Sequence, residues 1–130
     1  MTLGKHSLAL LATCDAELVR LVEAVAADID ARPGLHVHDV TVVCGHRGKA
    51  DQDAAYARGA SKLRWPHSAH NSYPSLAVDL APYPIDWTAR GRAGFEELRI
   101  RVHAVAEDLG IPLRADISWD LPHYQLRTKP

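Results

Sequence analysis

Residues 75–82, SLAVDLAP, combine a short apolar run with one aspartate, Asp79, near its middle. The run from 76 to 81 has the length and apolar content of a buried strand. Side chains alternate between the two faces of a strand, so the bulky residues share one face and Asp79 shares the other with alanines. The two sets are Leu76, Val78 and Leu80, and Ala77, Asp79 and Ala81. We expect the bulky face to pack into a core and the carboxylate to point into an open surface with small walls.

The rest of the chain predicts an α+β fold around this strand. Apolar residues at helical spacing indicate helices over 15–31 and 92–109, and a shorter helix is expected over 49–58. Further strands are expected over 36–44, near 113–117 and near 122–127. This order favours a small, mostly antiparallel sheet with helices packed on one side. At 130 residues the chain is expected to form a single domain, residues 1–130.

Composition excludes several classes of protein. Lys and Arg total 15 against 16 Asp and Glu, and no basic run indicates a nucleic-acid partner. No segment approaches the roughly 20 apolar residues that cross a membrane. The apolar start of the chain is interrupted by Cys14, Asp15 and Glu17, so no signal peptide is expected. Two cysteines cannot form the disulfide framework of a small secreted domain, and we interpret Cys14 and Cys44 as small buried side chains. We expect a monomer.

Two histidines could join Asp79 around a metal ion. His70 lies nine residues earlier in a loop of small and polar residues, and His123 lies in WDLPHYQL, residues 119–126. If the chain after Pro122 is a strand, His123 can lie beside Asp79 on a neighbouring strand. Two imidazoles and one carboxylate are a common zinc ligand set that leaves the fourth tetrahedral position to water. The pattern therefore predicts a hydrolytic zinc site.

Two charged residues could complete such a site. Asp120 precedes His123 by three residues, close enough to take a proton from the attacking water and pass it to a leaving amine. Arg47, in CGHRGKADQ (44–52), follows the end of another predicted strand. A fixed guanidinium there could hold a substrate carboxylate or the oxyanion that forms at the attacked carbonyl.

Three segments together resemble the D-alanyl-D-alanine carboxypeptidase family of zinc peptidases, which includes the phage L-alanyl-D-glutamate endolysins. SAHNSYPSLAVD (68–79) resembles the SxH…D signature of that family, CGHRGKADQ its G-x-R segment followed by Gln, and WDLPHYQL its acid-x-x-His end. The motifs occur in the family's order. The resemblance implies the hedgehog/D-Ala-D-Ala peptidase-like fold.

The resemblance also implies roles for individual residues. Zinc would bind His70, Asp79 and His123, and Asp120 would be the general base. Three further residues would serve the substrate site: Arg47 as substrate and transition-state contact, Gln52 as support for its loop, and Ser68 as the residue that shapes the loop before His70. Two departures from the family pattern stand out. The spacing from His70 to Asp79 is two residues longer than usual, as in a phage subgroup, and the acid is Asp120 rather than Glu, as in the endolysin branch.

By this resemblance the expected function is zinc-dependent cleavage of peptidoglycan stem peptides at the L-Ala–D-Glu bond by a phage or prophage endolysin. The expectation includes synthesis in the bacterial cytoplasm, release through a holin-type pore, action on the cell wall, and no separate wall-binding domain. Two alternatives stay open: a D-Ala-D-Ala carboxypeptidase or dipeptidase, and a binding module of the same fold that holds zinc without catalysis.

Several residues have competing interpretations. His67 is a rival ligand three residues before His70, but two loop histidines would close the metal site to water, so we interpret it as a loop residue. Arg47 could pair with Asp51, and Asp120 could simply form the turn before Pro122. Nothing in the sequence assigns a role to His46.

Overall fold

A three-stranded antiparallel sheet forms the centre of the protein. The structure, a computed structural model, describes residues 3–117 and 119–127. The strands are β1 (Val40–Cys44), β2 (Ala77–Pro82) and β3 (His123–Gln125), in the order β1–β2–β3. Both pairs of neighbours run antiparallel, with β2 in the middle. The α+β class with a small antiparallel sheet, predicted from the sequence, is confirmed.

Helices surround this sheet. They are α1 (Lys5–Leu11), α2 (Ala16–Ala31), α3 (Lys49–Ala57) and α4 (Arg92–Leu109), with short 3-10 turns η1 (Ala69–Asn71) and η2 (Ala89–Gly91). The start of α2 is fixed by Asp15, whose side chain accepts a hydrogen bond from the Glu17 amide. The end of α4 is fixed by Gly110, which adopts the left-handed conformation at φ 71° that glycine tolerates. The three longer helices were predicted within one or two residues, whereas α1 was not.

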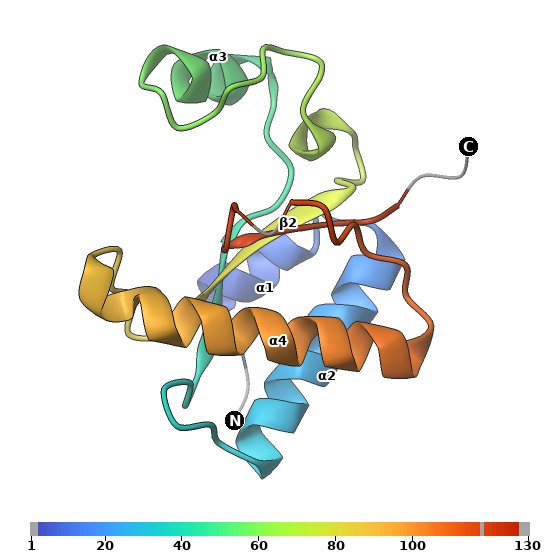
Figure 1. Cartoon of the computed structure of the whole chain (residues 1–130). Coiled ribbons are helices and arrows are strands. Elements are labelled where there is room, and N and C mark those ends of the chain that lie inside the picture. Colours follow the sequence, from blue (N-terminus) through green and yellow to red (C-terminus); the bar gives the residue numbers. More distant parts are fainter. Residues whose placement is uncertain (1–2, 118, 128–130) are drawn as a thin grey trace.

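One face of the sheet forms the hydrophobic core with α2 and α4, which pack against each other (Figure 1). Val78 and Leu80 of β2 have no exposed surface and join a cluster with apolar side chains of both helices. The chain from α3 to η1 lies beyond the other side of the sheet (Figure 1). The sheet therefore separates an apolar layer from the loops that approach its opposite face.

Three sequence-based expectations need correction. The strand near 113–117 does not form: among the described residues there, only Leu113 pairs, in an isolated bridge with Leu126. The strand expected over 36–44 begins only at Val40. Ala77 and Ala81 have no exposed surface, so the Asp79 face is enclosed rather than open. The alternation of residues in β2 alone does not reveal this enclosure, because it depends on segments distant in the sequence.

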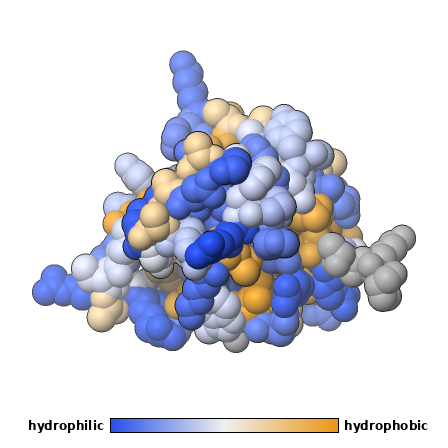
Figure 2. All heavy atoms as spheres, turned by 90° about the horizontal axis from the view of Figure 1, so that it is seen from above, coloured by the Kyte–Doolittle hydropathy of each residue, from blue (hydrophilic) through white to orange (hydrophobic). Residues whose placement is uncertain are grey.

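The surface above the sheet is mainly polar. Seen from above, hydrophobic residues show only in small areas between hydrophilic ones (Figure 2). No helix in the described part of the chain is both long enough and apolar enough to span a membrane.

Candidate metal centre

Three side chains meet over the middle of the sheet. Asp79 lies on β2 directly opposite His123 of β3, and the loop turn η1 brings His70 to the same point. The His70 Nε2 atom is 3.1 Å from Asp79 Oδ1 and 3.3 Å from His123 Nδ1, and His123 Nδ1 is 3.2 Å from the same Oδ1. The side chains of His70, Asp79 and His123 are 3%, 18% and 14% exposed, respectively. Residues up to 53 positions apart thus form one nearly buried cluster that still reaches solvent.

The position of His70 is fixed by a tightly bonded turn. Ser68 caps η1 by accepting a hydrogen bond from the His70 amide, and Asn71 completes the capping box by accepting one from the Ser68 amide. The His70 carbonyl in turn accepts a hydrogen bond from the Arg47 amide at 2.8 Å. These contacts tie the histidine loop to the segment after β1.

The outer nitrogen of each imidazole already has an acceptor. His70 Nδ1 donates to the Gly45 carbonyl at 2.7 Å, and His123 Nε2 donates to Gln125 Oε1 at 2.9 Å. When both imidazoles are neutral, the inner nitrogens, His70 Nε2 and His123 Nδ1, present lone pairs toward the Asp79 carboxylate. Three acceptor atoms pointing at one another repel unless a positive charge lies between them. Without a metal ion, a proton on His70 Nε2 can supply the positive charge between them and donate to Asp79 Oδ1. This arrangement is typical of metal ligands oriented by outer hydrogen bonds.

The pKa values show that the cluster favours positive charge. Burial alone would lower the pKa of His70, but hydrogen bonds to Asp79 and Cys44 outweigh it and raise the pKa to about 10. Burial would raise the pKa of Asp79, yet hydrogen bonds from His123 and His70 hold it well below its usual range. The carboxylate stays ionised, and a cation beside it is strongly stabilised.

The spacing of the three atoms fits a zinc ion. Ligand atoms at about 2.0–2.1 Å from a tetrahedral ion lie about 3.3 Å from one another. The measured separations of 3.1, 3.2 and 3.3 Å match that edge length. Two imidazole nitrogens and one carboxylate oxygen are also a donor set that zinc binds. The residues present therefore fit the ion that the sequence predicts.

Cys44 gives the same region a second possible ligand set. Its Sγ atom, a carboxylate oxygen of Asp79 and a ring nitrogen of His70 lie close enough to one another to hold a metal ion. Strict alternation would place Cys44 on the core side with Val40 and Val42, but an irregularity after Val42 turns it opposite Asp79. However, Sγ approaches His70 at Nδ1, 3.8 Å away, which is the nitrogen that donates to Gly45. We favour the set with His123, because it leaves that hydrogen bond intact.

Arg47 lies beside this cluster, held by two neighbours. Its guanidinium donates to Gln52 Oε1 at 2.9 Å and to Cys44 Sγ at 3.6 Å. Gln52 has no exposed surface, and its amide also bonds Asn71, Ser61 and the Leu63 carbonyl. Among the described residues, Arg47 forms no ion pair, so the alternative pairing with Asp51 is not what the structure shows. Gln52 therefore holds the Arg47 guanidinium in place, and because its side chain is fully buried it cannot contact a ligand directly.

Asp120 lies on the segment that leads into β3. It is half-buried, and burial is the main reason that the pKa of its carboxyl is raised; the charge of Asp79 adds to this. Its carbonyl accepts the His123 amide at 3.0 Å, so Asp120 does also form a turn. The buried Arg99 of α4 donates to the carbonyls of Asp120, Leu121 and His123 at 3.2–3.5 Å. Helix α4 of the core thus positions the segment that carries Asp120 and His123.

The other histidines near the site lie outside the cluster. His67 is exposed, and only its backbone amide, which donates to Arg64, is engaged in the local turn. His46 bonds the Ser72 carbonyl through Nδ1 at 2.9 Å and meets the Tyr73 ring edge-on. The structure brings together His70, Asp79 and His123, with Arg47 and Ser68 in adjoining positions.

Several supporting residues escaped the sequence analysis. Gly45 is needed because a Cβ there would collide with the Leu10 carbonyl and Thr13 Oγ1, and its close fit places its carbonyl beside His70. Asn71 could have been identified from its place three residues after Ser68, the spacing of a capping box. Gln125 lies two residues after His123, so strand alternation places both side chains on the same face. Nothing local in the sequence of α4 indicated Arg99.

Comparison with known proteins shows the fold. The chain is similar to the crystal structure of the Serratia marcescens L-Ala D-Glu endopeptidase ChiX, with a TM-score of 0.71 and 24% sequence identity over 95% of this chain and 87% of that one. No family model matches the sequence, and no curated protein matches it. The two chains share a peptidase-like α+β fold; their low identity leaves the function to be argued from the site.

Proposed function

We propose that this protein is a zinc-dependent peptidase that cleaves peptidoglycan stem peptides at the L-Ala–D-Glu bond. The observation that carries the proposal is the convergence of His70 Nε2, Asp79 Oδ1 and His123 Nδ1 within 3.3 Å, with both outer imidazole nitrogens engaged elsewhere. The order of the three sequence motifs and the fold shared with an L-Ala D-Glu endopeptidase support the choice of reaction.

Zinc would be held by His70, Asp79 and His123, which leave one tetrahedral position for solvent or substrate. Bound there, zinc would supply Lewis-acid polarisation of the scissile carbonyl and would lower the pKa of a water molecule. Cys44 would remain outside the ligand set and would contact Arg47 and His70 instead.

Asp120 would act as the general base. Its raised pKa brings the carboxylate closer to the strength needed to accept a proton from water and to return it to the leaving amine of D-glutamate. Arg99 donates to the Asp120 carbonyl and so helps to fix the backbone from which the carboxylate extends.

Arg47 would bind the negative charge that develops on the attacked carbonyl oxygen. Its guanidinium is held by Gln52 and Cys44, and its backbone is tied to the His70 loop on both sides, through the His70 carbonyl and Asn71. A donor fixed in advance stabilises such charge without a reorganisation cost at the moment of reaction. Ser68 would contribute by shaping the loop that carries His70 and is hydrogen-bonded to Arg47.

In this proposal residues 1–130 form one catalytic domain of a phage or prophage endolysin, made in the host cytoplasm and released to the wall by a holin. The substrate would bind on the polar surface above the sheet, over the metal centre. The proposal includes action as a monomer.

The test is digestion of purified peptidoglycan and of its isolated stem peptides by the zinc-loaded protein, followed by mass spectrometry. New N-terminal D-glutamate and C-terminal L-alanine are expected, and a chelator should abolish their release. Release of terminal D-alanine would assign a D-Ala-D-Ala carboxypeptidase instead. Asp120→Asn should retain zinc and lose turnover by about 10²–10⁴-fold. Intact substrate with stoichiometric zinc would contradict the proposal.

A further inference from the structure

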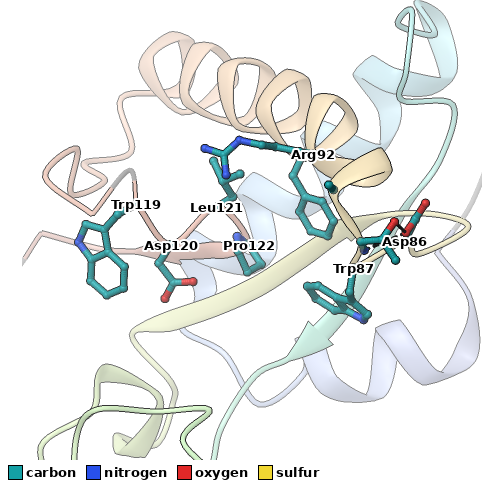
Figure 3. Close-up of a pocket in the computed structure, with 10 residues that line it drawn as sticks. Asp86, Trp87, Arg92, Trp119, Asp120, Leu121 and Pro122 are labelled. Carbon is teal, nitrogen blue, oxygen red and sulfur yellow. Dashed lines mark hydrogen bonds between the residues drawn. The ribbon is translucent and has the colours of Figure 1, made fainter.

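A pocket beside the metal centre is not used by the mechanism above. It has a volume of about 350 Å³ and lies between the segment 86–95 and the segment 119–122. Asp120 lines it, so the pocket adjoins the proposed general base. Trp87 and Trp119 stand at its opposite ends, with Arg92 above and Pro122 between them (Figure 3). A ligand in this pocket would therefore lie beside the Asp120 side chain.

The two tryptophans are unusually exposed for their size. Trp87 is 62% and Trp119 71% exposed, although each indole would be more stable if it were buried. Trp87 is nevertheless fixed, because it stacks on the buried Phe95 with ring centroids 5.1 Å apart and planes inclined by 28°. The Lys62 ammonium lies 5.5 Å from the centre of the Trp119 ring. The pocket thus has two flat aromatic walls, of which at least one is rigid.

Charged side chains also line the pocket: Arg92 lies above it, Asp120 beside Trp119, and Asp86 beside Trp87 (Figure 3). Asp86, whose pKa is lowered by hydrogen bonds from Thr88, stays ionised, and Arg92 offers guanidinium donors beyond the Nε that binds Glu96. An apolar ligand would bury these charges without partners, which is costly. A sugar ring suits both features, because its C–H face packs against an aromatic face and its hydroxyls pair with carboxylates and guanidinium at the rim.

We propose that this Trp87–Trp119 pocket binds the glycan strand to which the stem peptide is attached. The inference rests on the proposed function for the identity of the polymer, but the pocket's affinity for sugar does not depend on catalysis. Its volume falls at the lower end of the range for ligand pockets, which suits a short stretch of sugar rings rather than a long oligosaccharide. Sugar bound there would place the linked peptide next to Asp120.

Binding is tested without turnover by titrating the zinc-loaded protein with N-acetylglucosaminyl-N-acetylmuramic acid, its lactyl carboxylate capped as an amide. Two of the three tryptophans of the chain line the pocket, so saturable fluorescence quenching is expected. Trp87→Ala and Trp119→Ala should each weaken binding by about tenfold or more. Tyr83→Ala, which removes an aromatic side chain 57% exposed outside the pocket, should leave binding unchanged. Absence of saturable binding by the folded wild type would overturn the inference.

Kinetics provide the second arm. Trp119→Ala should lower kcat/KM on a disaccharide-linked stem peptide by about tenfold while leaving kcat/KM on the same free peptide within about twofold. Trp119→Phe should recover most of the kcat/KM on the disaccharide-linked peptide. This recovery would separate the loss of a stacking surface from a loss of fold. Equal loss on both substrates would overturn the inference, since the pocket would then serve the peptide. Sugar binding without any cleavage would support the pocket and contradict the proposed function, so the two failures are distinguishable.

Discussion

On one face of β2, Val78 and Leu80 lie among apolar side chains of α2 and α4; on the other, Asp79 lies between two histidines. Both faces are largely removed from water, yet in different ways. Apolar contacts satisfy the first completely. The second gathers a carboxylate and two imidazole lone pairs, which only positive charge can satisfy. Adjacent residues of a single strand therefore serve the fold on one side and the proposed chemistry on the other.

The difference arises from what lies across the sheet. Opposite Val78 and Leu80 are Tyr124 and Val42, both buried. Opposite Asp79 are His123 on β3 and, because of the irregularity in β1, Cys44. A single irregularity in β1 thus adds a thiol to the polar row, while Val40 and Val42 stay buried in the core.

The largest effect should follow a change on the polar face. Asp79→Asn keeps the size of the side chain but removes its charge, so zinc affinity should fall by more than about 100-fold, beyond the loss usual for an outer partner of a ligand. Cleavage should be lost with it. Isothermal titration with zinc measures the affinity, and circular dichroism verifies the fold. Zinc affinity close to that of the wild type would show that Asp79 is no ligand.

A change one residue further along the strand should act on stability instead. Leu80→Ala removes a fully buried side chain, and the free energy of unfolding should fall by about 2–5 kcal/mol. The zinc affinity of the folded protein should stay within about threefold of the wild type, because Leu80 faces away from the ligands. Urea denaturation of the zinc-free protein measures the first quantity. An equally large loss of zinc affinity would mean that the two faces are not independent.

A smaller effect is expected from the outer acceptor of His123. Gln125→Ala removes the oxygen to which Nε2 donates, which frees the imidazole to rotate or change tautomer. Zinc affinity should fall by about 10–100-fold. Gln125→Glu, which keeps an acceptor in place, serves as the matched control and should retain most of the affinity. If Gln125→Ala binds zinc as tightly as the wild type, this hydrogen bond does not help His123 to bind the metal.

The sequence predicted the core face of β2 more completely than the polar face. Alternation identified Val78 and Leu80 as core and placed Asp79 on the other side, because local periodicity is set by strand geometry. His70, Asp79 and His123 were predicted together from their motifs. The roles of Gly45 and Arg99 were missed, since they depend on how distant segments approach, which no local pattern encodes. The strand expected over 113–117 failed for the same reason: β-forming residues there had no strand to pair with beyond Leu113.

The smallest effect concerns acid. A general base must be ionised, and burial raises the pKa of Asp120 above the usual value for aspartate of about 3.9. As pH falls through this raised pKa, kcat/KM should decline by about tenfold per pH unit. The decline should begin while zinc content, measured in parallel, is still complete. A profile that stays flat until zinc dissociates would exclude Asp120 as the base.

The central claim is that His70, Asp79 and His123 hold one zinc ion and that Cys44 does not. X-ray absorption spectroscopy of the zinc-loaded protein tests it directly, because zinc–sulfur bonds of about 2.3 Å are distinct from zinc–nitrogen and zinc–oxygen bonds of about 2.0–2.1 Å. We predict two imidazole signatures, a further oxygen shell and no sulfur, with one imidazole signature lost in His123→Ala. A sulfur shell at full occupancy, or two imidazoles retained in His123→Ala, would contradict the account.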